Sequence, residues 1–163
     1  MEVRACTASD ISAVQAIYAH HVRTGLGTFE EEPPTVAEMR GRFDAIVARS
    51  FPFLVAEIEK RVAGYAYAGA FRPRAAYRHT CESSVYVAAD MQRRGVGHAL
   101  MLRLIAICQK LGQRQMLAVI GDSANLGSIG LHAALGFESV GVFKSVGFKF
   151  GRWVDVVLMQ RAL

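Results

Sequence analysis

The sequence predicts a single α/β domain built on a mixed β-sheet. Two apolar segments, 53–58 and 62–70, are separated by a short polar link, which is the spacing of an antiparallel hairpin. From residue 80 onward, strand-like and helix-like segments alternate in the order β-α-β-α-β. Such alternation is typical of strands connected by helices that pack on the sheet. The two patterns together indicate a sheet that begins antiparallel and continues through helical connections.

The first part of the chain predicts one strand and two helices. Residues 3–6 form the strand, and the helix that follows begins with a capping box in which Asp10 replaces the usual Glu and stops at Gly25. Thr35 and Glu38 form a second capping box, which opens the next helix. The residues of this second helix that are expected to face inward are Val36, Met39, Phe43 and Ile46.

The part of the chain after the hairpin predicts a central strand over 80–87 and a helix that ends at Leu111-Gly112. Residues 116–120 are a continuous apolar run, which is typical of a strand buried on both faces. The remaining elements are a helix over 126–135, strands over 140–146 and 154–159, and a turn over 148–153.

Composition limits the class of protein. A chain of 163 residues can bury a core, and 52% hydrophobic residues with 20% charged residues exclude disorder. No apolar run reaches the roughly 18 residues of a membrane span, and the first residues lack the pattern of a signal peptide. We therefore expect a soluble, cytoplasmic protein without a membrane partner.

Cysteines and histidines do not predict a metal site. Cys6, Cys81 and Cys108 are odd in number and widely spaced, so we expect buried thiols rather than disulfides or a zinc knuckle. His20 and His21 would point about 100° apart on a helix, which does not suit a shared metal. The net charge of +5 suggests an anionic partner, but the dispersed arginines make a nucleic acid the weaker choice.

The loop between the central strand and the next helix has the pattern of an anion-binding site. Gly95 and Gly97 let backbone N–H groups converge, the helix dipole points its positive end at the same place, and Arg93 and Arg94 add charge. The same glycines would also suit an ordinary strand-to-helix connection. A dinucleotide fingerprint is excluded because Leu100 stands where its third glycine should be, and no Walker A tripeptide follows.

Several motifs in order resemble the GCN5-related N-acetyltransferases, or GNAT family. They are Gln92-x-x-Gly95-x-Gly97 at the head of a helix and, about thirty residues later, Asn125-x-x-Ser128-x-x-Leu131-His132-x-x-x-Gly136-Phe137. Segments 77–87 and 146–155 look like those of the phosphinothricin and methionine sulfoximine acetyltransferases. The resemblance covers nearly the whole chain. It implies a mixed sheet of six to seven strands with about four helices, whose central strands splay to form the acetyl-CoA site.

The resemblance implies acetyl-CoA as the acetyl donor, with no metal. The glycine loop would bind the CoA diphosphate, and the pantetheine arm would pair with the central strand like an extra strand. The Val87 amide would then lie near the thioester carbonyl and stabilise the oxyanion. The residues expected to bind acetyl-CoA are Val85, Tyr86, Val87, Gln92, Arg93, Arg94, Gly95, Val96, Gly97, His98, Asn125 and Ser128. Helix capping alone could account for Asn125.

Two side chains are expected to carry the chemistry of the implied acetyl transfer. Glu82, on the central strand, would accept the proton of the amine directly or through water, unless it is paired with Arg78 or another arginine. His132 stands where many relatives have a tyrosine that acts as general acid, and a histidine could serve as acid or base. The alternative for His132 is a helix histidine satisfied by one hydrogen bond.

The implied acceptor is a small amine that resembles an amino acid, such as phosphinothricin or methionine sulfoximine. It would present a carboxylate to arginine and an ammonium group to a carboxylate. The residues expected to bind it are Phe29, Glu30, Arg72, Arg74 and Lys149. The loop carboxylates and arginines could equally be merely exposed to solvent. Two other functions stay open. One is a protein or peptide N-acetyltransferase, and the other is a non-catalytic acyl-CoA-binding or nucleic-acid-binding module. The resemblance also implies a homodimer.

Overall fold

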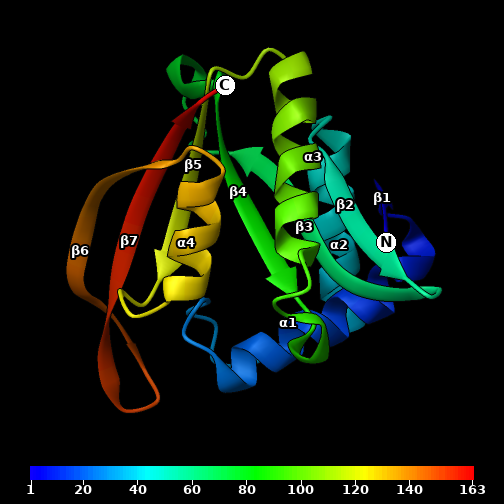
Figure 1. Cartoon of the computed structure of the whole chain (residues 1–163), viewed down its shortest axis with the longest axis horizontal. Helices are drawn as coiled ribbons and strands as arrows, with labels where there is room; N and C mark the ends of the chain where they lie inside the picture. The colour runs from blue at the N-terminus through cyan, green and yellow to red at the C-terminus, as the bar shows by residue number, and fades with distance from the viewer.

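One seven-stranded mixed sheet organises the chain, and the computed structural model describes residues 1–163. The strand order is β1-β2-β3-β4-β5-β7-β6 (Figure 1). The strands are β1 (Glu2–Ala5), β2 (Phe53–Ile58), β3 (Arg61–Ala70), β4 (Thr80–Val87), β5 (Gln115–Gly121), β6 (Glu138–Lys149) and β7 (Arg152–Ala162). The helices are α1 (Ile11–Thr24), α2 (Val36–Ala48), α3 (Val96–Lys110) and α4 (Leu126–Ala134). The predicted mixed α/β fold is confirmed.

The sheet contains one parallel pair of neighbouring strands, at its centre. Neighbouring strands from β1 to β4 pair antiparallel, β4 and β5 pair parallel, and β7 then pairs antiparallel with both β5 and β6. The hairpin of β2 and β3 turns through Glu59 and Lys60, both with positive φ, which is the geometry of a two-residue hairpin turn. The parallel pair in the middle is the one that a helical crossover, α3, connects.

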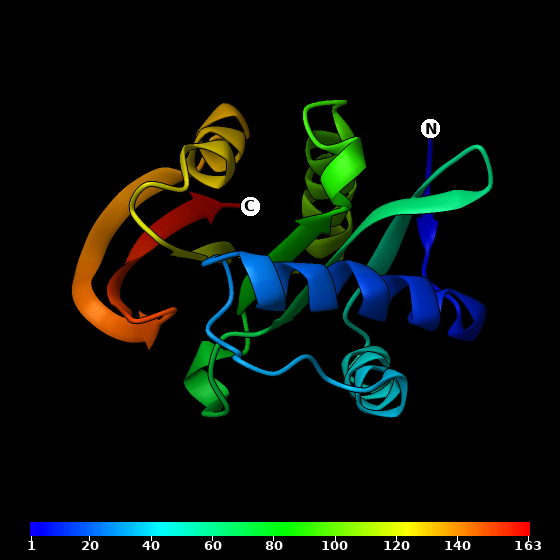
Figure 2. The same cartoon turned by 90° about the horizontal axis from the view of Figure 1, so that it is seen from below.

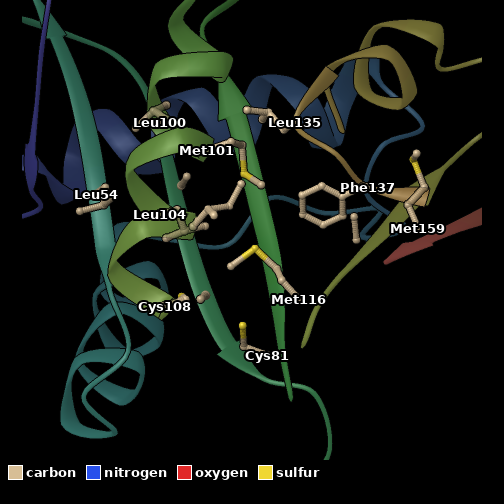
Figure 3. Close-up of a cluster of buried hydrophobic side chains, with 14 of the residues drawn as sticks. Leu54, Cys81, Leu100, Met101, Leu104, Cys108, Met116, Leu135, Phe137 and Met159 are labelled. Atoms are coloured by element: carbon tan, nitrogen blue, oxygen red, sulfur yellow. The ribbon is translucent and has the colours of Figure 1, made fainter. Parts of the chain in front are cut away.

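Helices cover both faces of the sheet. Figure 2 shows α3 and α4 on one face and α1 and α2 on the other. The face under α3 and α4 buries a mainly aliphatic core, to which α3 contributes Leu100 and Leu104 and β5 contributes Met116 (Figure 3). The face under α1 and α2 buries a second cluster rich in aromatic rings, including Phe43 and Tyr65. None of the four helices combines the length and the apolar character that spanning a membrane requires.

Three local predictions are wrong. Residues 116–120 are not buried on both faces, because Val119 is 43% exposed where β5 borders an open cleft. Val36 is exposed because it is the first residue of α2, ahead of the turns that reach the sheet. The last turn is only Phe150–Gly151, both with positive φ, because strand pairing between β6 and β7 extends to Lys149.

Candidate active site

A cleft opens where β4 and β5 separate. The two strands pair only from Thr80 to Ser83 on β4, and β5 continues by pairing with β7 on its other side. The resulting cavity has a volume of about 420 Å³ and is lined by the far halves of both strands, the glycine loop and the start of α4. The loop after α1 crosses the end of β5 so closely that a Cβ at Gly121 would collide with the carbonyl oxygen of Leu26. The splayed centre of the sheet therefore makes the cleft.

The open edge of β4 offers main-chain groups to this cleft. The Ala88 N–H donates to the Ala63 carbonyl of β3 at 2.9 Å, and the β3–β4 register has no shift. Because main-chain groups alternate between the two edges of an antiparallel strand, Val85 and Val87 direct theirs toward the cleft and Tyr86 directs its own toward β3. The expectation that Tyr86 offers main-chain hydrogen bonds to a ligand does not fit this geometry, although Tyr86 lines the cleft.

The glycine loop closes one end of the cleft. Gly95 caps α3 with a φ of +80°, which favours glycine, and a Cβ on Gly97 would press on the side chain of Leu131 at 3.2 Å. The N-terminus of the 15-residue helix α3 thus faces the cleft with its positive dipole end. Of the residues expected to bind the cosubstrate, all line the cleft except Arg94, whose guanidinium contacts the sulfur of Met91 at 3.0 Å.

The observed groups fit a nucleotide cosubstrate with an amide-containing arm. An anion-binding helix terminus stands beside a strand edge whose Val85 and Val87 N–H groups have no strand partner. Asn125 caps α4, because its Oδ1 accepts from Ser128 N at 3.2 Å, so capping accounts for its position while both residues also line the cleft. No group of three or more histidine, cysteine or acidic side chains is gathered as metal ligands would be.

His132 lies on α4 and lines the cleft, although only 3% of it is exposed. Its Nδ1 is 2.8 Å from the Ser128 carbonyl oxygen, and because a carbonyl can only accept, Nδ1 carries the proton. Burial lowers the pKa of the imidazole, so the neutral form is favoured. The remaining nitrogen, Nε2, makes no hydrogen bond to the protein and presents a lone pair. Of the two roles that the sequence leaves open for His132, acid or base, this state suits the base.

Glu82 lies on β4 but does not line the cleft. Strand alternation turns its side chain to the face of α1 and α2, together with Tyr86. It makes no hydrogen bond or ion pair, and burial alone raises its pKa. The expected alternative, pairing with Arg78, is wrong, because the Arg78 guanidinium donates to the Ala75 carbonyl instead.

The positions of Glu82 and the Val87 amide cannot both meet one acetyl group. Five residues of extended strand separate them, which corresponds to roughly 16 Å. Val85 is only three residues, or about 10 Å, from Glu82, and it is the first cleft-facing residue after the pairing of β4 with β5 ends. The expected role of Val87 at the thioester carbonyl therefore does not fit a reaction at Glu82.

The residues expected to bind the acceptor fall into two separate groups, and none lines the cleft. Phe29 packs on Gly147, and the Glu30 carboxylate is held by two hydrogen bonds from Arg42, at 2.6 and 3.1 Å. Lys149 is only 1% exposed, and its Nζ donates to the carbonyl oxygens of Gly25 and Thr28. Lys149 is thus a clamp for the loop after α1, so its expected contact with an acceptor is not available in this structure.

Arg72 and Arg74 form the other group, on the exposed loop between β3 and β4. The Arg72 guanidinium lies over the rings of Phe71 and Tyr77, with distances of 5.0 and 5.7 Å to the ring centroids. Two further residues, Arg42 beside Glu30 and His21 in the cleft, are not predicted by the sequence. No local sequence pattern indicates either contact.

Comparison with known proteins gives consistent results. The family model described as "Acetyltransferase (GNAT) domain" matches residues 3–158. The chain is 55% identical over 161 residues to a phosphinothricin N-acetyltransferase of Alcaligenes faecalis, covering 99% of this chain and 82% of that protein. It is 39% identical to an L-methionine sulfoximine/L-methionine sulfone acetyltransferase of Pseudomonas paraeruginosa, covering 97% of this chain and 92% of that protein.

Solved structures share the whole fold. A phosphinothricin acetyltransferase from Sinorhizobium meliloti, solved in complex with acetyl-CoA, has a TM-score of 0.97 at 46% identity and covers 99% of this chain and 88% of its own. A ribosomal-protein-alanine N-acetyltransferase from Brucella melitensis also has a TM-score of 0.97, at 37% identity, with both chains fully covered. With a family model spanning nearly all of its residues and full-length relatives above 30% identity, the chain belongs to the GNAT acetyltransferase family.

Proposed function

We propose that the protein transfers the acetyl group of acetyl-CoA to the amino group of a small acceptor that resembles an amino acid, such as phosphinothricin, methionine sulfoximine or methionine sulfone. The observation that carries the proposal is the unpaired edge of β4, which lies between an anion-binding helix terminus at one end and Glu82 toward the other. The full-length similarity to proteins named for these acceptors supports this choice of amine.

The cleft would hold the cosubstrate by its polar groups. When bound, acetyl-CoA supplies an acetyl thioester. The N-terminus of α3 binds the diphosphate through backbone N–H groups, helped by the charge of Arg93, and the N–H groups of Val85 and Val87 pair with the arm. We assign the Val85 N–H to the carbonyl oxygen of the thioester, because it is the unpaired donor nearest to Glu82.

Glu82 is the proposed general base. A carboxylate without a protein partner, with its pKa raised by burial, is poised to accept a proton from the ammonium group of the acceptor, directly or through water. His132 is the second proton acceptor, because the residue lines the cleft and its Nδ1 is protonated, which leaves the lone pair on Nε2. Changing both residues, Glu82→Gln with His132→Ala, is expected to abolish turnover while CoA binding persists. Unchanged turnover would overturn these roles.

The acceptor would bind on the face of α1 and α2, where the Glu82 side chain points. Glu30 and Phe29 border this face through the loop after α1, and Arg72 and Arg74 lie on the loop that leads into β4. Arg42 neutralises Glu30 in the present structure, so an ammonium group would share or replace that ion pair. Lys149 contributes by holding the loop in place.

An acceptor panel tests the proposed activity. Purified protein is incubated with acetyl-CoA and each of phosphinothricin, methionine sulfoximine, methionine sulfone and the common L-amino acids, and the release of free thiol is recorded. Thiol release with at least one of the three named acceptors, well above the rate without acceptor, is the expected result. Background rates with every acceptor would contradict the proposal even if CoA binds.

A second function, acetylation of a protein or peptide N-terminus, is favoured by one specific observation. The B. melitensis structure, named for a ribosomal-protein alanine, shares the fold as closely as the S. meliloti structure does. Peptides with N-terminal alanine, added to the same assay, separate the two functions. Acetylated peptides with inert small acceptors would favour this second function.

The protein is further proposed to be a cytoplasmic homodimer. Three buried thiols without a disulfide suit a reducing compartment, which supports the cytoplasmic location.

The proposed dimer rests on one surface. The β6–β7 hairpin carries seven exposed large apolar side chains on a sheet edge, namely Val140, Val142, Phe143, Val146, Phe148, Phe150 and Trp153. Such a patch on an edge strand suits a second copy of this chain. Light scattering should give twice the chain mass, and the Trp153→Glu variant should shift toward monomer; a monomeric wild type would contradict a dimer.

A further inference from the structure

The last peptide of β4 is held from both sides. His21 Nε2 lies 2.8 Å from the Val87 carbonyl oxygen, and because this oxygen can only accept, Nε2 carries the hydrogen. The N–H of the same peptide belongs to Ala88 and donates to the Ala63 carbonyl at 2.9 Å. In Figure 1 the arrow of β4 ends close to α1, the helix that carries His21. Both hydrogen bonds therefore act where the strand ends and the glycine loop approaches.

The hydrogen bond from His21 replaces one that a neighbouring strand would otherwise make to Val87. The Val87 carbonyl points to the edge that β5 has left, so without His21 this acceptor would have no partner in the protein. The Val87 N–H points the same way and stays free. The ring itself lines the cleft and packs against Tyr86, with ring centroids 5.4 Å apart. His21 thus occupies the acceptor and leaves the donor of this residue open to a ligand.

We propose that His21 is a positioning residue for acetyl-CoA, a role that rests on the proposed function. By fixing the peptide between Val87 and Ala88, it sets the direction in which the chain leaves β4. That direction determines whether the Val87 N–H and the N-terminus of α3 can meet one extended ligand at the same time. The role concerns cosubstrate affinity, because His21 acts through the hydrogen bond that Nε2 donates to the Val87 carbonyl and that orients this peptide.

Helix α1 also supports the acceptor side, but through a different residue. Tyr18, one turn before His21, shares hydrogen bonds with Thr28 Oγ1 at 2.8 Å and Glu30 Oε1 at 3.0 Å. The two functions of α1 are therefore carried by two side chains. A change at His21 should affect the KM for acetyl-CoA, and a Tyr18→Phe change should affect the KM for the acceptor. A general loosening of α1 would affect both constants together.

Variants of His21 test the role directly. His21→Phe keeps a ring but removes the donor, whereas the amide of His21→Gln can still donate to Val87. His20→Phe is the matched control, because His20 is the exposed neighbour and phenylalanine keeps a ring that can pack edge-on against His21. CoA affinity is measured by calorimetry, the KM for acetyl-CoA and kcat by thiol release, and folding by thermal melting. We expect His21→Phe to weaken CoA binding and raise this KM about tenfold.

In the same comparison, His21→Gln should stay within about threefold of wild type, and His20→Phe should not differ from it. If His21→Phe does not fold, His21→Asn, whose amide is one methylene shorter, takes its place as the loss variant. CoA affinity equal to wild type in the loss variant, or no recovery in His21→Gln, would overturn the inference. Because calorimetry needs no acceptor, failure of the acetylation assay with normal CoA binding would overturn the proposed function alone; absence of CoA binding in wild type would overturn both.

Discussion

Two regions of the molecule remove carboxylates from water, and they treat them in opposite ways. At the start of the sheet, Arg4 holds Asp10 with hydrogen bonds of 2.8 and 2.9 Å and also contacts Glu57 at 2.8 Å. The hydrogen bonds from Arg4 lower the pKa of Asp10 to about 2. In the centre of the sheet, Glu82 has no hydrogen bond or ion pair, and burial raises its pKa.

The difference separates a structural charge from a chemical one. A paired carboxylate is fixed as an anion, and it stabilises the fold because its partners replace the lost water. An unpaired, partly buried carboxylate destabilises the fold when it ionises, but its raised pKa makes it a better proton acceptor than an ordinary carboxylate. The first region therefore should matter for stability and the second for turnover.

The largest expected effect separates the two regions by activity. Glu82→Gln keeps the shape of the side chain but removes the proton acceptor, so kcat should fall at least 100-fold, within the usual contribution of a general base. Glu57→Gln, in the paired cluster, is the control and should stay within about twofold of wild type. Thiol release at saturating acetyl-CoA measures both. A Glu82→Gln enzyme with near-normal kcat would remove the functional half of the comparison.

The next effect concerns stability. Asp10→Asn removes the charge that Arg4 pairs with, and it should lower the free energy of unfolding by about 1.5 kcal/mol at pH 7, since solvent at the exposed side of Arg4 weakens the attraction. Urea unfolding followed by circular dichroism measures the change. Turnover of the folded variant should match wild type. An unchanged unfolding midpoint would mean that the cluster does not contribute to stability.

The pH dependence of stability should have opposite signs in the two regions. Asp10 has a folded pKa of about 2, below its ordinary value of 3.8, so its contribution is present above pH 3.8 and is lost as the pH falls toward 2. Glu82 has a raised folded pKa, so its contribution is present below its ordinary value of 4.5 and is lost as the pH rises through the folded pKa.

Urea unfolding at a series of pH values tests these signs with the two variants. The deficit of Asp10→Asn relative to wild type should disappear as the pH falls below 3.8 toward 2. Glu82→Gln should gain stability relative to wild type as the pH rises above 4.5, because it has no charge to bury. Parallel curves for wild type and Glu82→Gln would show that the Glu82 carboxylate is not destabilised by burial.

The parts of the structure that depend on neighbouring residues could be predicted from the sequence. The strands, the helices and the glycine loop follow from local patterns, because periodicity, capping boxes and glycine conformation act over a few residues. The Thr35–Glu38 capping box is one example, since both of its hydrogen bonds form as predicted. The loop residues that line the cleft could also be predicted, because the glycine motif places them at the start of α3.

Contacts between distant segments could not be predicted in this way. The sequence predicts that Lys149 lies in a turn and binds the acceptor. Pairing of β6 with β7 instead places it under the loop after α1, where it contacts Gly25, 124 residues away in the chain. Glu82 and Arg78 are close in the sequence but do not pair, because the short helical turn over 75–77 directs the arginine to its own backbone. His21 meets Val87 only after the sheet has formed.

The smallest expected effect defines the exposed limit of the comparison. Asp44 on α2 pairs with Arg40 one turn earlier at 2.9 Å, but both side chains are about half exposed. Because water screens this pair and replaces the lost partner at once, Asp44→Asn should change the free energy of unfolding by no more than about 0.5 kcal/mol. Salt at 1 M should remove most of the stability difference between Asp44→Asn and wild type, because it screens exposed charges. The larger stability loss of Asp10→Asn should persist in 1 M salt, because the Arg4–Asp10 pair is half-buried and is screened less. Equal losses of unfolding free energy in Asp44→Asn and Asp10→Asn would contradict this prediction. They would mean that burial does not strengthen the Arg4–Asp10 ion pair.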